Sequence, residues 1–206
     1  MQCRERGAID LEPDQTAGRV TLKRVLLKAI AASGTVVSVI ACAALADTIV
    51  VPDDATFQAA LDAAATGDTV LVRAGTYPGP FTLSNKDVTL VGESGSGSTV
   101  LDGQDLVRVL DVGSGVSTAT RIVGFAITRG RAANGSGIML ASNSGLTIES
   151  CHFSNCTPTG GDFTTGALHV GENADCILRE SMFTQNSARQ GGALYLGLHV
   201  SGHCRA

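Results

Sequence analysis

The stretch TGDTVLVRAGTYPGPFTLSNKDVTLVGES (residues 66–94) decides the expected fold. Apolar and polar residues alternate in it, the alternation breaks at a turn, and the same pattern resumes after a short interval. Alternation over about four to eight residues is typical of a strand with one buried face. The stretch therefore predicts several brief strands in succession, separated by turns rich in Gly, Asn, Ser and Asp.

One helix is expected before these strands, in ATFQAALDAAA (residues 55–65), with Asp53 or Asp54 as its N-cap. Its apolar residues fall on one face: Phe57, Ala60, Leu61 and Ala64. Gly75-Thr76-Tyr77 is expected as a turn. The expected strands are Thr69–Arg73, Asp87–Val91, Val107–Val112, Arg121–Thr128, Gly137–Ala141, Leu146–Glu149, Ala167–Val170, Ile177–Arg179 and Ala193–Leu196.

Two features recur along the second half of the chain. IVGFAITRG (122–130), IESCHFSNC (148–156) and LRESMFTQN (178–186) align when Ile127, Phe153 and Phe183 are superposed, with offsets of 26 and 30 residues. SGIML (136–140), TGALHV (165–170) and GGALYL (191–196) align on Gly137, Gly166 and Gly192. Such self-similarity indicates stacked units that cannot bury their apolar sides alone.

These units contain short strands and no helix, which predicts a right-handed parallel β-helix with three to four coils before Leu198. Equivalent residues of successive coils would lie about 4.8 Å apart, with inward aliphatic and Phe side chains forming ladders. The preceding helix would cap the first coil and cover its edge strands.

The N-terminal part has the features of a secretion signal. Residues 1–19 are polar, which suggests a start codon assigned too early, with initiation near Val20. Residues 20–46 carry a basic start, an apolar run and small residues before a cleavage site after Ala46. Two alternatives are a retained membrane anchor and lipidation of Cys42 in a lipobox-like Val-Ile-Ala-Cys sequence.

The charge balance disfavours nucleic acid as a partner. From Asp47 onward the chain has nine Lys and Arg against fifteen Asp and Glu, and it contains no basic cluster.

Residues 47–197 resemble the pectin lyase-like family of right-handed β-helix proteins. Residues 47–103, with a helix, Gly-Asp-Thr-Val and Gly-Thr-Tyr, are similar to the opening of pectin methylesterases. Gly191-Gly192-Ala193-Leu194 and Phe183-Thr184-Gln185-Asn186 are similar to the Gly-Gly-Ala-Ile and Phe-x-x-Asn marks of polymorphic outer membrane proteins. The resemblance implies the fold, but this scaffold carries enzymes and adhesins alike.

The resemblance also implies what a lyase would need, namely outward carboxylates that bind calcium and an Arg or Lys that removes a proton. The only sequence cluster of this kind is Asp102, Asp105 and Asp111 with Arg108, and turn or strand-end roles explain it as well. The motifs that carry the paired Asp residues of pectin methylesterases have no counterpart here. We therefore assign no catalytic residue, no cofactor and no metal, and calcium enters only with the lyase alternative.

His169 and Tyr195 share one repeat position, with Leu140 expected at that position one coil earlier. Alternation would turn both side chains outward and place them side by side, either to stack against a sugar or as an ordinary cross-strand pair. These two residues are the candidate ligand face.

The cysteines favour neither a zinc site nor a disulfide. Cys3 and Cys42 precede the expected cleavage site, and Cys204 lies in the irregular tail 198–206. Cys176 should stack over Leu146, about 16 Å from Cys151 along the strand, so buried ladder positions are expected for Cys151, Cys156 and Cys176. Asn155 and Asn186 are expected to bond backbone groups between coils.

The sequence thus predicts a secreted or cell-surface bacterial β-helix scaffold that is structural or interacts with extracellular polysaccharide or cell-surface components. The pattern stops abruptly after residue 197, so a longer parent protein, or self-association through an open C-terminal edge, is also expected. A uronate lyase whose catalytic coils are missing or unrecognised is the alternative.

Overall fold

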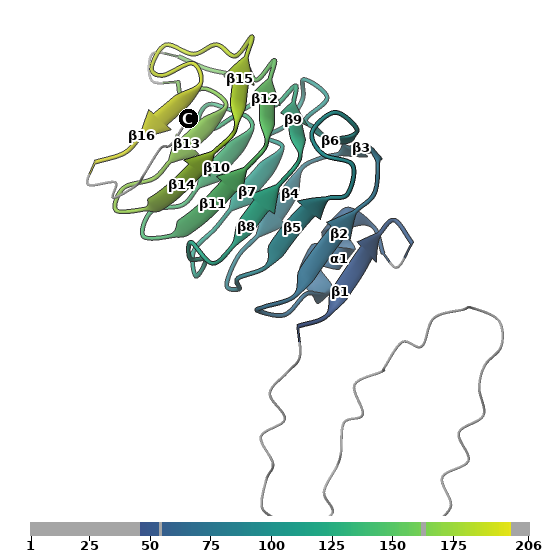
Figure 1. Cartoon of the computed structure of the whole chain (residues 1–206). Coiled ribbons are helices and arrows are strands. Elements are labelled where there is room, and N and C mark those ends of the chain that lie inside the picture. Colours follow the sequence, from purple (N-terminus) through teal and green to yellow (C-terminus); the bar gives the residue numbers. More distant parts are fainter. Residues whose placement is uncertain (1–45, 54, 162–163, 199–206) are drawn as a thin grey trace, which may run out of the picture. The chain divides into compact units, whose positions relative to one another are not determined.

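The computed structural model describes residues 46–53, 55–161 and 164–198. They form an all-parallel β-helix of about 5 turns with one short helix near its start (Figure 1). The expected fold is confirmed, but the expected three to four coils are too few. Strands that the alternation did not reveal make up the difference, and the expected turn Gly75-Thr76-Tyr77 lies in one of them, at Gly75–Pro78.

Three parallel sheets form the walls of the β-helix, and we call them sheets A, B and C. In each sheet, a strand pairs with the equivalent strand of the next coil. Sheet A contains β1 (Thr48–Val51), β2 (Thr69–Val72), β5 (Thr89–Gly92), β8 (Arg121–Val123), β11 (Gly145–Glu149) and β14 (Asp175–Arg179). Sheet B contains β3 (Gly75–Pro78), β6 (Thr99–Asp102), β9 (Ala126–Thr128), β12 (His152–Ser154) and β15 (Met182–Thr184). Sheet C contains β4 (Phe81–Leu83), β7 (Leu110–Val112), β10 (Ile138–Leu140), β13 (Leu168–Val170) and β16 (Leu194–Leu196).

The core consists of ladders of inward side chains. Each coil contributes one side chain to each ladder. On sheet B, Phe153 lies opposite Ile127 of the coil before and Phe183 of the coil after, which confirms the first repeat alignment. The rings of Phe153 and Phe183 stack with centroids 4.7 Å apart and planes 6° apart. This separation matches the spacing of strands in a sheet, so identical side chains in successive coils pack face to face.

The second repeat alignment is wrong by one residue in its first coil. Ile138 pairs with Leu168, so Ser136 and not Gly137 is equivalent to Gly166. Because side chains alternate between the two faces of a strand, a shift of one residue exchanges inward and outward positions. The three aligned segments share a glycine motif, but the hydrogen bonds between coils determine the register.

Helix α1 (Phe57–Ala63) covers the N-terminal end of the β-helix, as expected. Its N-cap is Thr56, whose hydroxyl accepts a hydrogen bond from the Ala59 N–H at 3.4 Å, so the expected Asp53 or Asp54 cap is wrong. Asp53 instead pairs with Arg73 at 2.7 Å. The apolar residues of the helix are buried as expected, and the Phe57 ring packs edge-on against Phe81 at 4.5 Å.

The last carbonyls of α1 are bonded by a lysine from the next coil. Lys86 Nζ donates hydrogen bonds to the carbonyls of Leu61, of Asp62 at 3.0 Å and of Ala64 at 2.9 Å. A cation at the C-terminus of a helix also interacts favourably with the helix dipole. This contact joins the cap to the body of the β-helix.

The corner between sheets A and B is very short in the last three coils. Two residues connect the strands there, and the first of them adopts a left-handed conformation in each coil: Gly124 (φ 76°), Ser150 (φ 51°) and Glu180 (φ 47°). The chain therefore turns this corner in the same way each time, which keeps the ladders of both sheets in register.

Several sequence-based predictions lie outside the described residues. They are the early start at residues 1–19, the signal peptide up to Leu45, the lipobox cysteine Cys42, and the tail after Leu198.

Candidate functional site

His169 and Tyr195 lie side by side on the outer face of sheet C, as expected. They pair across β13 and β16, and their rings are stacked with centroids 4.9 Å apart and planes 17° apart. Each ring therefore covers one face of the other, and no sugar can lie between them. The groups that the pair offers to a ligand are its ring edges, with the imidazole nitrogen Nε2 and the phenol oxygen of Tyr195.

The outward row continues down sheet C, but through Met139 and not through Leu140. Met139 pairs with both His169 and Asp111, whereas Leu140 is fully buried. The expected position of Leu140 followed from the glycine alignment that is wrong by one residue. The row of outward side chains on successive coils is Thr82, Asp111, Met139, His169 and Tyr195.

A threonine and a glycine hold the His169 ring. The Thr165 hydroxyl lies 2.9 Å from His169 Nδ1 and accepts the Gly135 N–H at 3.0 Å. Its alternative acceptor, Asn134 Oδ1, is farther away at 3.5 Å. The Thr165 hydroxyl therefore fixes the orientation of the His169 ring through Nδ1, and Nε2 is left for a ligand.

The position of Gly135 leaves room for this arrangement. Its φ is +52°, and an added Cβ would lie 2.9 Å from the Cβ of His169.

Burial lowers the pKa of His169 below its usual value, and the positive charge of Arg108 lowers it further. His169 is therefore neutral near pH 7.

Arg108 connects the row to the loop beneath His169. Its guanidinium pairs with Asp111, and it also donates to the carbonyls of Gly135 at 3.2 Å and Asn134 at 3.1 Å. Asp111, Arg108 and His169 thus belong to one network of hydrogen bonds on one face of the protein. This network fixes polar groups at the surface before any ligand binds.

The structure separates the acidic residues that stand close together in the sequence. Asp102 is buried, pairs with Arg129 and accepts the Gln104 N–H at 2.8 Å. Asp111 pairs with Arg108, and Asp105 is exposed in the intervening loop. Across the described ranges, no three His, Cys, Asp or Glu side chains come close enough to hold a metal ion.

The sequence analysis missed the supporting residues, namely Arg108 as part of this face, Met139, Asn134, Gly135 and Thr165. One signal could have found Met139. The offset of 30 residues between Phe153 and Phe183, applied from Met139, leads to His169. The loop residues have no such signal, because their loops differ in length from coil to coil.

The three described cysteines are buried thiols that form no disulfide with one another, as expected for ladder positions. Cys176 lies opposite Leu146. Burial raises the pKa of the Cys151 and Cys156 thiols to about 11. These two thiols are therefore protonated near pH 7 and unsuited to nucleophilic chemistry.

Asn186 bonds the coil before it, as expected. Its side-chain oxygen accepts the Cys156 N–H at 2.9 Å, and its amide donates to the Phe153 carbonyl at 3.0 Å. Asn155 adopts a left-handed conformation at a turn (φ 55°) and is exposed. Of the two asparagines, Asn186 is therefore the one that bonds backbone groups through its side chain.

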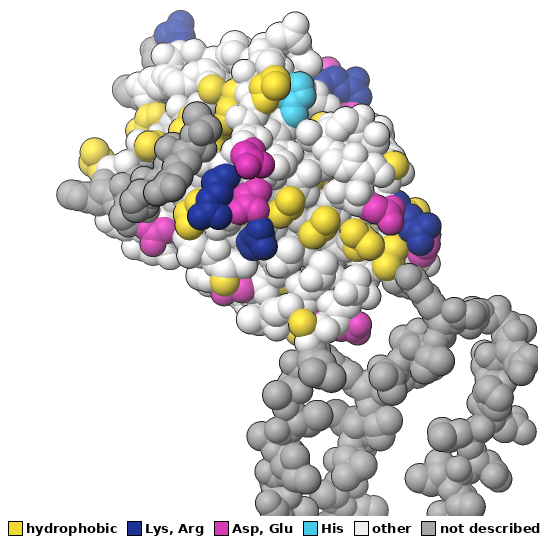
Figure 2. Space-filling model, viewed as in Figure 1, with side chains coloured by type: hydrophobic (Ala, Val, Ile, Leu, Met, Phe, Trp, Pro, Cys, Tyr) yellow, Lys and Arg dark blue, Asp and Glu magenta, His cyan; other side chains and the backbone are white. Residues whose placement is uncertain are grey.

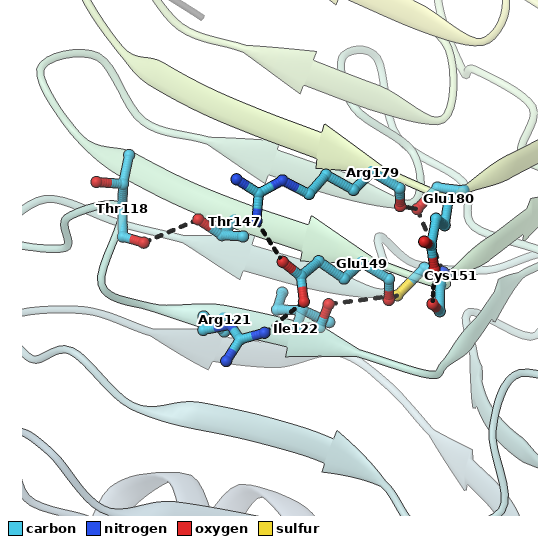
Figure 3. Close-up of polar contacts among 10 residues, drawn as sticks. Thr118, Arg121, Ile122, Thr147, Glu149, Cys151, Arg179 and Glu180 are labelled. Carbon is cyan, nitrogen blue, oxygen red and sulfur yellow. Dashed lines mark hydrogen bonds and ion pairs between the residues drawn. The ribbon is translucent and has the colours of Figure 1, made fainter. Parts of the chain in front are cut away.

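A second charged group lies on the outer face of sheet A. Glu149 of β11 pairs with Arg121 of β8 and with Arg179 of β14, the latter at 2.9 Å, so three coils are joined (Figure 3). Basic and acidic side chains gather in one mixed group on the face shown in Figure 2. The hydrogen bonds from both arginines lower the pKa of Glu149 despite its partial burial. Because one carboxylate accepts from both arginines, this group joins three strands of the sheet.

No model of a known protein family, no curated protein and no solved structure matches this chain. Among the described residues, no helix has the length and apolar character needed to cross a membrane.

Proposed function

We propose that this β-helix is a secreted or cell-surface scaffold of the pectin lyase-like kind that binds glycans by contact, through the outward row on sheet C. The observation that carries the proposal is the prearranged polar row from Asp111 to Tyr195. The expected signal peptide before Asp47 supports an extracellular location. The Gly-Gly-Ala-Leu and Phe-x-x-Asn repeats support the comparison with polymorphic outer membrane proteins.

The chemistry of the row suits a saccharide. Sugar hydroxyls both donate and accept hydrogen bonds, and the row offers a carboxylate acceptor at Asp111, the imidazole nitrogen Nε2 of His169 and a hydroxyl at Tyr195. Met139 lies between these groups and offers an apolar contact for the C–H faces of a sugar ring. Successive coils are about 4.8 Å apart, so a chain of several sugars that follows the β-helix axis can contact several rungs.

The uronate lyase alternative receives less support. Its carboxylates would need to converge, but Asp102 and Asp111 are each held by a different arginine. Incubation with polygalacturonate and calcium tests the alternative directly, because a lyase would generate an unsaturated product that absorbs in the ultraviolet.

A glycan panel tests the proposal. The wild-type protein, the double variant His169→Ala/Tyr195→Ala and the control Thr89→Ala, on the outer face of sheet A, are compared on immobilised extracellular polysaccharides. We expect the double variant to bind at least about tenfold more weakly to the glycans that the wild type retains, because two contacts at the centre of the face are lost. Binding that is unchanged in the double variant, or equally reduced in Thr89→Ala, would contradict the proposal.

A further inference from the structure

One loop between sheets B and C is longer than its neighbours in the adjacent coils. The connection from β9 to β10 has nine residues (129–137), that from β12 to β13 has thirteen (155–167), and that from β15 to β16 has nine (185–193). The middle loop thus carries four extra residues. These explain why the coil offset is 30 residues across this loop and 26 across the loops on either side.

The described parts of the long loop are hydrogen-bonded to the neighbouring coils. The loop is bonded to the loop below through the Thr157 N–H to the Gly130 carbonyl at 3.0 Å and the Thr159 N–H to the Ala132 carbonyl at 3.2 Å. Near its other end, the Thr164 carbonyl accepts the Gln190 N–H at 2.9 Å. An open groove of about 440 Å³ lies beside these anchors.

The described lining of this groove is polar and contains two arginines. Hydroxyls and backbone groups of three successive coils contribute to it, and its walls are held by the backbone hydrogen bonds above. The lining residues are Arg131, Thr157, Pro158, Gly160, Gly161, Thr164, Ser187, Ala188 and Arg189.

Arg131 differs from most basic residues of the protein. Six described basic side chains hold a carboxylate or carbonyl group: Arg73, Lys86, Arg108, Arg121, Arg129 and Arg179. Arg131 is exposed and has no ion pair or side-chain hydrogen bond with another described residue, although the protein carries an excess of acidic groups. Its five N–H donors are therefore available to a planar or tetrahedral anion.

The groove adjoins the proposed glycan face. Thr164 lines the groove, and the next residue, Thr165, holds the His169 ring. Consecutive residues of one loop thus line the groove and support the glycan face.

We propose that this groove binds an anionic substituent, a sulfate ester or a carboxylate, of a glycan whose chain lies on sheet C. This inference rests on the proposed function and names the ligand as an acidic saccharide. Arg131 supplies the charge, Arg189 also lines the groove, and the hydroxyls of Thr157 and Ser187 donate further hydrogen bonds. The net acidic charge of the body disfavours anions elsewhere on the surface, so an acidic glycan binds where Arg131 offers a positive charge.

Three polymers of equal length separate the contributions: unmodified dextran, carboxymethyl-dextran and dextran sulfate. Binding is measured at constant ionic strength for the wild type, Arg131→Gln and the matched control Arg73→Gln, which removes the same charge from an exposed ion pair elsewhere. We expect Arg131→Gln to weaken binding of at least one acidic polymer about tenfold and Arg73→Gln to change it less than about twofold. The acidic polymer that loses affinity identifies the anion.

Binding of inorganic sulfate provides a second test, which does not depend on glycan binding. Titration of sulfate is followed through the arginine side-chain NMR signals, and we expect the Arg131 signal to shift while the Arg73 signal stays. Equal losses for both variants with the acidic polymers would show non-specific attraction and overturn the groove. In another outcome, sulfate shifts the Arg131 signal while the variant His169→Ala/Tyr195→Ala binds every glycan as the wild type does. That result would support the groove as an anion site and contradict the proposed glycan face.

Discussion

The first and last described coils contain equivalent strands but bury their side chains differently. In the first coil, α1 packs over the end of the stack, and Phe57, Leu61 and Phe81 are at most 5% exposed. In the last coil, Phe183 and Leu194 occupy inward ladder positions yet are only partly buried, while Met182 and Leu196 are exposed. The interior of this fold is therefore completed by what lies above and below a coil, and each coil is stabilised by its neighbours.

The largest expected effect is a difference in stability between alanine variants of two phenylalanines in one ladder. Phe153→Ala should reduce the free energy of unfolding by about 3–5 kcal/mol, because the buried ring leaves a cavity between two coils. Phe183→Ala should cost only about 1–2 kcal/mol, since that ring is partly exposed and has one described neighbour in the ladder. Urea unfolding of both variants measures the difference, and equal losses would show that neighbouring coils do not determine burial.

The helix cap offers a second test of the same comparison. Lys86→Met should cost about 1–3 kcal/mol, because the last carbonyls of α1 lose their charged donor. The control Arg73→Met removes an exposed ion pair and should change stability by less than about 1 kcal/mol. Hydrogen exchange of the α1 amides should rise in Lys86→Met alone; unchanged protection would mean that Lys86 does not hold the cap.

Removal of a buried hydroxyl from the core of the first coils should raise the stability of the protein. Thr99 is fully buried, and its hydroxyl oxygen has no hydrogen-bond partner among the described residues. Thr99→Val keeps the shape of the side chain and removes the unsatisfied group, so stability should rise by up to about 1 kcal/mol. Thermal unfolding measures the change; a clear loss of stability would indicate that the hydroxyl is bonded in solution.

The smallest expected effect is a pH dependence from the coil next to the last. Because burial and Arg108 lower the pKa of His169, the unfolded chain takes up a proton at this residue at a higher pH than the folded protein does. Stability should therefore fall as the pH drops below about 6.5, the usual histidine value, and level off below the folded pKa. His169→Asn should flatten this part of the stability profile, measured by urea unfolding from neutral to mildly acidic pH; an unchanged profile would contradict the assignment.

The fold could be predicted because its inward positions repeat with simple spacing. Ile127, Phe153 and Phe183 mark one ladder in the sequence, and they form that ladder in the structure. Two of the missed strands, β3 and β4, are short and contain Gly, Pro and Thr, so their pairing with later coils, rather than local preference, makes them strands.

The candidate site could be predicted only in part. The alignment of TGALHV with GGALYL placed His169 beside Tyr195, and alternation turned both side chains outward. It could not identify Met139, since a glycine motif suggested a register that the interstrand hydrogen bonds do not have. Arg108, Thr165 and Arg131 depend on loops, and the sequence does not state which loops meet.

The unequal corners of the coil have a consequence for how this protein can change. In the last three coils the A-to-B corner holds two residues each time, whereas the B-to-C corner holds nine, thirteen and nine. The ladders stay in register across that whole range. In these coils the A-to-B corner keeps its length and the B-to-C corner varies, so new loops can be inserted at the B-to-C corner, by evolution or by design, while the core is left intact.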